Sequence, residues 1–187
     1  MIYTLNALQK EYQRGKTYRY LFFWGHHPAV DGTIGASCLS QWWSQDFKID
    51  GISYCCAEQY MMAEKARLFS DIAMLEKIMC ARSPKEMKAY GRMVQRFDDE
   101  IWSANAYDIV RRASAAKFGQ NPELLRFLIS TGNRILVEAS PYDRIWGIGM
   151  DRKSPDASNP MKWRGTNLLG FALTQTRNEL LKRDEAA

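Results

Sequence analysis

The feature that most restricts the fold of this sequence is a succession of helix-start signals between residues 56 and 131. Ser83-Pro84 and Asn121-Pro122 each place a capping residue directly before a proline, and proline is favourable at the first helical position. Asp98-Asp99-Glu100 places negative charge where a further helix would begin, which favours a helix N-terminus. We expect helices over residues 56–69, 71–81, 84–94, from 98 towards 118, 122–130 and 167–183.

Extended segments are few and short. Residues 18–24 (YRYLFFW) and 134–138 (RILVE) are rich in β-prone residues, and Asp50-Gly51 lies between two such segments in FKIDGISY, which is a strong hairpin signal. Residues 151–165, which hold two prolines, are expected to form a long surface loop. The sequence therefore predicts a mainly α fold of the α+β class, a compact helical domain with a small β element.

The chain is expected to form a single domain over residues 1–187, because no Gly/Ser/Pro-rich linker divides it. Its net charge of +5 and pI near 9.0 favour anionic partners. The basic residues are interspersed with acidic ones, so a small phosphorylated molecule explains this charge as well as nucleic acid does. Aromatic residues make up 12% of the chain, and they could form core or the walls of a site for a flat ligand.

The expected compartment is the cytoplasm. The four cysteines (38, 55, 56 and 80) have no zinc-site or disulfide-scaffold spacing, which favours reduced thiols. The first sixteen residues lack the pattern of a secretory signal, and no run of the sequence reaches the roughly 18 to 20 apolar residues of a membrane span. We therefore expect no membrane partner.

Several common chemistries find no support in the sequence. His26 and His27 are the only histidines, and adjacent side chains seldom converge on one metal without further ligands. No GxSxG elbow is present, and Gly147-Ile148-Gly149 is too short for a dinucleotide fingerprint. The expectation is no metal and no organic cofactor, which leaves carboxylates, lysine and aromatic residues as candidates.

The segment CAEQYMMAEKA (56–66) carries Glu58 and Lys65 seven positions apart. On a helix they differ by about 20° in direction and about 10 Å along the axis. Glu58 is expected one or two turns into the helix, where it could simply favour the helix N-terminus, and Lys65 could be a solvated residue. Composition alone therefore leaves two alternatives, a site or surface decoration.

A second candidate group lies in Ser140-Pro141-Tyr142-Asp143-Arg144-Ile145-Trp146-Gly147. A carboxylate, a guanidinium and an indole within four positions suit recognition of a polar ring that bears phosphate. The alternatives are that Asp143 fixes a turn or pairs with Arg144. Trp146, like Trp102 in the long helix, could equally be core.

Several ordered motifs resemble the NADAR or YbiA-like family. They cover about residues 20 to 181, nearly the whole chain, and their order and spacing are compatible with those of the family. The motifs are FFWGHHP (22–28), CLSQWW (38–43), AEQYMMAEKA (57–66), YGR (90–92), Trp102, AKF (116–118), LVEASPYDRIWGIG (136–149) and WRGTNLLGFAL (163–173).

The resemblance implies N-glycosidases linked to riboflavin-pathway intermediates, with relatives that remove ADP-ribose from guanine bases. It implies catalytic roles for Glu58, Lys65, Trp102 and Asp143. It places in the ligand pocket Phe23, Trp24, Ser40, Gln59, Tyr60, Arg92, Arg144, Trp146, Gly147 and Asn167. Many relatives have His after the glutamate and Asn after the serine, where this chain has Gln59 and Gln41, which bears on substrate preference.

The implied reaction is hydrolysis of the C–N bond between a phosphorylated ribose and an amine or base. Glu58 and Asp143 would supply base and electrostatic roles. Lys65 would either hold phosphate as a cation or form a Schiff base as a neutral amine. All four catalytic side chains are expected around one sugar-sized cavity.

Three functions stay open at this point. The first is an N-glycosidase for a small phosphorylated N-riboside, such as a riboflavin precursor. The second is removal of ADP-ribose from guanine, with nucleic acid as a partner. The third is a non-catalytic ADP-ribose or nucleotide-binding module.

Overall fold

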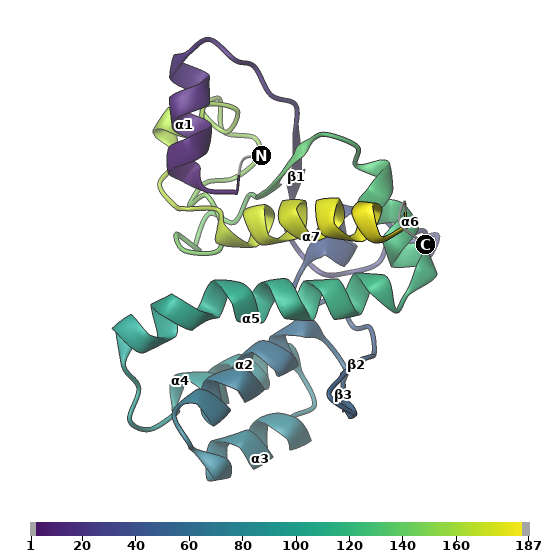
Figure 1. The fold of residues 1–187 in the computed structure, drawn as a ribbon, viewed down its shortest axis with the longest axis vertical. Coiled ribbons are helices and arrows are strands. Elements are labelled where there is room, and N and C mark those ends of the chain that lie inside the picture. The colour runs from purple at the N-terminus through teal and green to yellow at the C-terminus, as the bar shows by residue number, and fades with distance from the viewer. Residues whose placement is uncertain (1–2, 185–187) are drawn as a thin grey trace. The chain divides into compact units, whose positions relative to one another are not determined.

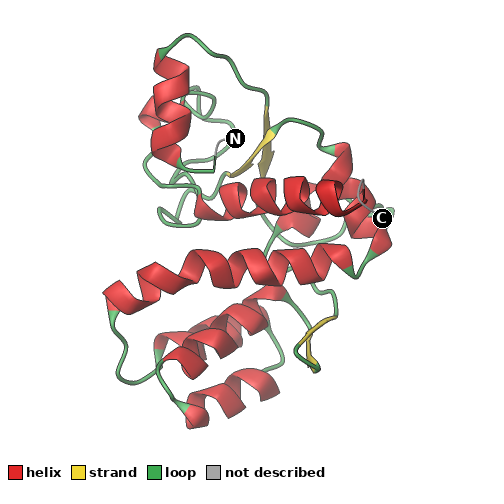
Figure 2. Ribbon diagram, viewed as in Figure 1, coloured by secondary structure: helices red, strands yellow, loops and turns green. Residues whose placement is uncertain are grey.

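The computed structural model describes residues 3–184 of the chain, without the side chain of Asp184. Helices dominate and the strands are short (Figures 1 and 2), so the prediction of a mainly α, α+β fold is confirmed. The chain divides into two compact units, a central unit (residues 41–122) and a terminal unit (residues 1–40 with 123–187). The prediction of one domain is not tested by this division.

The central unit is a helical assembly around α2 (Ala57–Leu68). This helix contacts α3 (Ile72–Cys80), α4 (Pro84–Arg92) and α5 (Asp99–Gly119), and the four lie together in Figure 1. Since α2 is covered by three helices, eight of its twelve residues are buried, and it lacks the single apolar stripe of a surface helix. Gly91 lets α4 approach closely, because a Cβ there would lie 2.1 Å from Sδ of Met62.

The helix starts of the central unit follow the predicted capping chemistry. The side chains of Asp71, Ser83 and Asp98 accept hydrogen bonds from backbone N–H groups of the first turns of α3, α4 and α5. These bonds satisfy donors that a helix N-terminus otherwise leaves unpaired. The predicted boundaries are confirmed to within a few residues.

The predicted hairpin is also confirmed. β2 (Phe47–Ile49) pairs antiparallel with β3 (Ile52–Tyr54). Asp50 and Gly51 have φ angles of 52° and 80°, as a two-residue turn with a right-handed twist requires. The hairpin leads directly into α2, because Cys56 is the N-cap of that helix.

The terminal unit contains a parallel pair of strands, β1 (Tyr20–Phe23) and β4 (Ile135–Glu138). Helix α7 (Leu168–Asp184) packs on β4. Helix α6 (Pro122–Ser130) precedes β4, and two short 3₁₀ helices, η1 (Ala36–Leu39) and η2 (Pro160–Lys162), complete the unit with α1 (Leu5–Gln13). Gly170 allows α7 its close approach, since a Cβ there would lie 2.1 Å from the carbonyl oxygen of Leu136.

Three features differ from the sequence prediction. Helix α1, capped by Thr4, was not anticipated. The segment predicted as a surface loop (151–165) buries Ala157 and Trp163, whose indole Nε1 donates to the Ala157 carbonyl at 2.7 Å. The Asn121 side chain does not cap α6: its amide donates to the carbonyls of Asp46 and Lys117, which ties the end of α5 to the segment before the hairpin.

Candidate active site

Glu58 is the second residue of α2, so the expectation of one or two turns into the helix is wrong. Its side chain is only 5% exposed, and its backbone N–H donates to the carbonyl of Gln41 at 3.0 Å. A carboxylate in the first turn interacts favourably with the helix dipole. The position thus combines a buried acid with the positive end of the helix dipole.

Lys65 lies towards the other end of α2, with its ammonium between two aromatic rings. The Nζ atom is 4.0 Å from the centroid of the Phe97 ring and 5.4 Å from that of Trp102. Both distances are within the range of a cation–π contact. The structure therefore brings two predicted catalytic residues, Lys65 and Trp102, together through the packing of α5 on α2.

The pKa of Lys65 is lowered from the ordinary value of 10.5. Burial is the main cause, because it disfavours the charged amine, and the positive charge of Arg92 acts in the same direction. The carboxylate of Asp99 partly opposes them. At a given pH, a larger fraction of Lys65 than of a solvated lysine is therefore in the neutral amine form.

Phe97 is a contact that the sequence analysis missed. It is 44% exposed, lies just before the N-cap of α5, and meets Phe69 edge to face at 5.4 Å between centroids. An aromatic residue directly before a capping aspartate was the available signal. Only the packing of α2 and α5 shows that its ring faces a lysine.

Two predicted ligand contacts on α2 have structural roles. The Gln59 side chain accepts from the backbone N–H of Cys55 at 2.9 Å and donates to the carbonyls of Ile78 and Met79. Tyr60 is 1% exposed and packs edge to face on Tyr54, and burial raises its pKa to about 12. These contacts hold α2 against the hairpin and α3, and a role in ligand binding stays a prediction for both residues.

Asp143 is in the terminal unit, and its carboxylate fixes a turn. Oδ1 accepts from the backbone N–H groups of Ile145 and Trp146 at 2.9 and 2.7 Å. The Oγ of Ser140 accepts from the N–H of Asp143 at 3.1 Å, so the turn is held at both ends. The expectation that one cavity gathers Asp143 with Glu58, Lys65 and Trp102 stays a prediction.

Asn167 and Gly147 support the same region of the terminal unit from within. Asn167 is fully buried with a φ of 55°, and its side chain accepts from Glu138 N and donates to Leu136 O, both at 3.0 Å. A Cβ at Gly147 would lie 2.8 Å from the Glu138 carbonyl oxygen. Both residues position the 143–147 turn beside β4. This structural role explains why they are needed here without a ligand.

The remaining predicted contacts differ in accessibility. Phe23 is 2% exposed and belongs to the core, whereas Trp24 is 53% exposed and lies 6.2 Å from the Tyr142 ring. Ser40 and Trp146 are half-buried, and Arg92 and Arg144 are exposed. Trp24 and Arg144 of the terminal unit, and Arg92 of the central unit, are therefore each accessible from solvent.

Among residues 3–184, no group of three or more His, Cys, Asp or Glu side chains is placed to hold a metal ion. In the same part of the chain, no helix is long and apolar enough to cross a membrane.

A family model described as the NADAR domain matches residues 22–181. The chain belongs to the NADAR family. The chain is 41% identical over 169 residues to "N-glycosidase R617" of Acanthamoeba polyphaga mimivirus, covering 88% of this chain and 98% of that protein. It is 35% identical over 112 residues to "Riboflavin biosynthesis protein PYRR, chloroplastic" of Zea mays, which covers 58% of this chain and 16% of that protein.

The fold also resembles a solved structure. The NMR structure of the E. coli protein YbiA superposes with a TM-score of 0.72 at 24% identity, covering 92% of this chain and 90% of that one. At this identity the likeness concerns the fold alone.

Proposed function

We propose that this NADAR protein is an N-glycosidase that hydrolyses the C–N bond between a phosphorylated ribose and an amine or base. The observation that carries the proposal is the environment of Lys65, an amine of lowered pKa held between Phe97 and Trp102 on the same helix as the buried Glu58. The similarity to a protein named N-glycosidase along 98% of its length supports the same reaction.

The lowered pKa of Lys65 suits covalent participation. In an N-riboside of an amine the sugar opens to an imine at C1, to which neutral Nζ adds and forms a C1–Nζ bond. The amine takes up a proton and leaves as its C1–N bond breaks, which gives a C1=Nζ imine. Water then adds to C1, the C1–Nζ bond breaks, and the free aldehyde sugar and the lysine amine are regenerated.

Glu58 and Trp102 serve the same reaction in different ways. Glu58 is buried in the first turn of α2, and a carboxylate there would activate water and carry protons between water and the departing nitrogen. The indole of Trp102 would cover the sugar or base and limit access of water. Asp143 is assigned the second carboxylate role on the family resemblance, in addition to fixing its turn.

Two substrate classes remain within this proposal. The similarity to a riboflavin biosynthesis protein supports an aminopyrimidine ribose phosphate as the substrate. The net charge of +5 is compatible with the alternative, ADP-ribosylated guanine in nucleic acid, and equally with a small phosphorylated substrate. A cytoplasmic setting is part of the proposal for either substrate.

The test incubates the protein with the aminopyrimidine ribose phosphates and, separately, with ADP-ribosylated guanosine. Release of ribose phosphate from the first supports the riboflavin-type substrate, and release of ADP-ribose from the second supports the alternative. Binding of either compound without release would instead indicate a non-catalytic sensor and contradict the proposal. Borohydride during turnover, followed by mass analysis, should attach the sugar to Lys65.

A further inference from the structure

The terminal unit contains a cavity of about 590 Å³ between α1, β4 and α7. Its volume is within the range of small-molecule sites. Seven of its twelve lining residues precede residue 22, where the match to the NADAR domain begins. None of the residues assigned to hydrolysis lines it, so a ligand bound in this cavity would be independent of the proposed function.

Arg177 of α7 lines this cavity and is only 2% exposed. Its Nη1 donates to Thr131 Oγ1 at 2.7 Å and to the Arg134 carbonyl at 2.8 Å, and both acceptors are uncharged. Its Nε has no hydrogen-bond partner among the described residues. A buried cation without a paired carboxylate is costly, and an anion in the cavity would reduce that cost.

The other charges around the cavity increase this imbalance. Lys10, Arg14 and Lys16 line it with Glu11, and Glu11 pairs with both Arg14 and Lys16. One carboxylate is therefore shared by two of the four cations. Lys10, exposed in the last turn of α1, and Arg177 are left as the cations that an entering anion would meet.

Two tyrosines, Tyr3 and Tyr18, also line the cavity. Aromatic side chains bind nucleobases by stacking, and arginine binds phosphate through directional hydrogen bonds. We propose that this cavity binds a phosphorylated ligand of mononucleotide size, with Arg177 and Lys10 contacting the phosphate and tyrosine contacting the base.

The alternative is that Arg177 acts only as a structural link between α7 and the segment before β4. Burial lowers its pKa, Tyr3 partly opposes this shift, and Arg134 adds a smaller lowering. A purely structural link leaves Nε of Arg177 without a hydrogen-bond acceptor among the described residues. A bound anion would supply that acceptor together with a negative charge, which favours the ligand.

The test uses the full isotope-labelled chain and follows backbone amide NMR signals during addition of AMP, adenosine or inorganic phosphate. AMP is expected to shift the amides of α1 and of residues 174–178 saturably, phosphate to shift a subset more weakly, and adenosine to have little effect. No saturable shift in these amides up to millimolar AMP, or equal shifts with adenosine, would overturn the proposal. Shifts confined to residues 41–122 would do the same.

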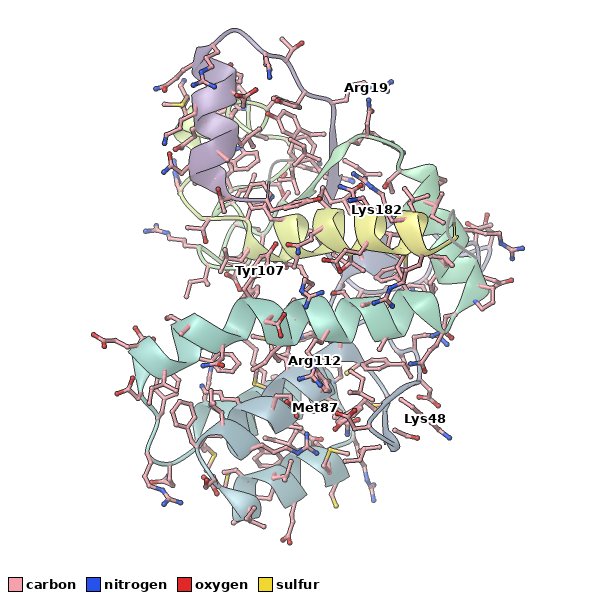
Figure 3. All side chains as sticks on the ribbon, in the orientation of Figure 1. Arg19, Lys48, Met87, Tyr107, Arg112 and Lys182 are labelled. Atoms are coloured by element: carbon pink, nitrogen blue, oxygen red, sulfur yellow. The ribbon has the colours of Figure 1, made fainter. Side chains whose placement is uncertain are left out.

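Matched variants then locate the phosphate. Lys10→Gln should weaken AMP binding several-fold, and Arg177→Gln about tenfold or more, because a charge-assisted hydrogen bond is lost. Lys182→Gln, at an exposed position on the same helix (Figure 3), should bind as the wild type does. If Arg177→Gln does not fold, Lys10→Gln decides: unchanged AMP affinity in that variant contradicts the assignment.

Discussion

The Nζ atom of Lys65 lies 4.0 Å from the centre of the Phe97 ring, and the pKa of the same amine is lowered by burial and by Arg92. The ring holds the ammonium by cation–π attraction, while burial favours the neutral amine. Because burial is the largest cause, the net effect is a pKa below the ordinary value of 10.5. Phe97 therefore helps to position the amine and forms part of the surroundings that bury it.

Replacing Phe97 by leucine should raise the pKa of Lys65. The smaller side chain admits water to the amine, so its pKa should rise towards 10.5. The pH–rate profile should shift to higher pH, with a loss of roughly tenfold in kcat at neutral pH. Met93→Leu, at an exposed position nearby, is the control and should leave the profile unchanged. An unshifted profile in Phe97→Leu would show that Phe97 does not set the pKa of Lys65.

The pH dependence of the wild type separates the two roles of Lys65. If the neutral amine attacks C1, kcat/KM should rise with pH through the lowered pKa of Lys65, which is below 10.5. If the ammonium only anchors phosphate, activity should fall over the same interval. Stopped assays across the alkaline range, with protein integrity confirmed by circular dichroism at each pH, distinguish these directions.

Gly170 and Gly91 should respond differently to alanine. The added Cβ at Gly170 meets the Leu136 carbonyl oxygen, which belongs to a paired strand and cannot move away. At Gly91 it meets Sδ and Cγ of Met62, which belong to a flexible side chain rather than to the backbone. Urea unfolding should show a larger loss for Gly170→Ala, about 3 kcal/mol or more, than for Gly91→Ala, at about 1 kcal/mol. Equal losses would contradict the packing of α7 on β4.

Asn167→Ala should destabilise the protein by about 2–4 kcal/mol. The change leaves Glu138 N and Leu136 O without their side-chain partner in a buried region and puts alanine at a φ of 55°. Asn167→Gly removes the same bonds but tolerates this backbone conformation. In chemical denaturation, the free energy of unfolding of the glycine variant should therefore lie between those of the wild type and the alanine variant.

The helical part of the fold follows from local signals in the sequence. The side chains of Ser83 and Asp98 each accept a backbone hydrogen bond from the first turn of the helix that follows them. This capping effect is local, so it does not depend on the rest of the chain. Asp50-Gly51 is similar, because its two positive φ angles are a property of the turn itself. Asn121 was misjudged because its amide finds partners in another segment.

The environment of the candidate site depends on packing, and the sequence could not supply it. Nothing in the spacing of Lys65, Phe97 and Trp102 indicates that two rings meet one amine, since this requires the crossing of α2 and α5. Gln59 likewise resembles a ligand contact by its motif, yet its side chain bonds the backbone of Cys55, just before α2, and that of Ile78 in α3. Family motifs thus indicate which residues matter and leave open whether they serve the ligand or the fold.

The most direct test of the central claim measures release of ribose phosphate from an aminopyrimidine ribose phosphate, or of ADP-ribose from the guanine substrate, by wild type and by Glu58→Gln. The wild type should turn over one of these compounds. Glu58→Gln should lose about a hundredfold or more in kcat, with the same unfolding midpoint, because the amide cannot accept a proton. Turnover by Glu58→Gln at the wild-type rate would contradict the claim that α2 carries the chemistry.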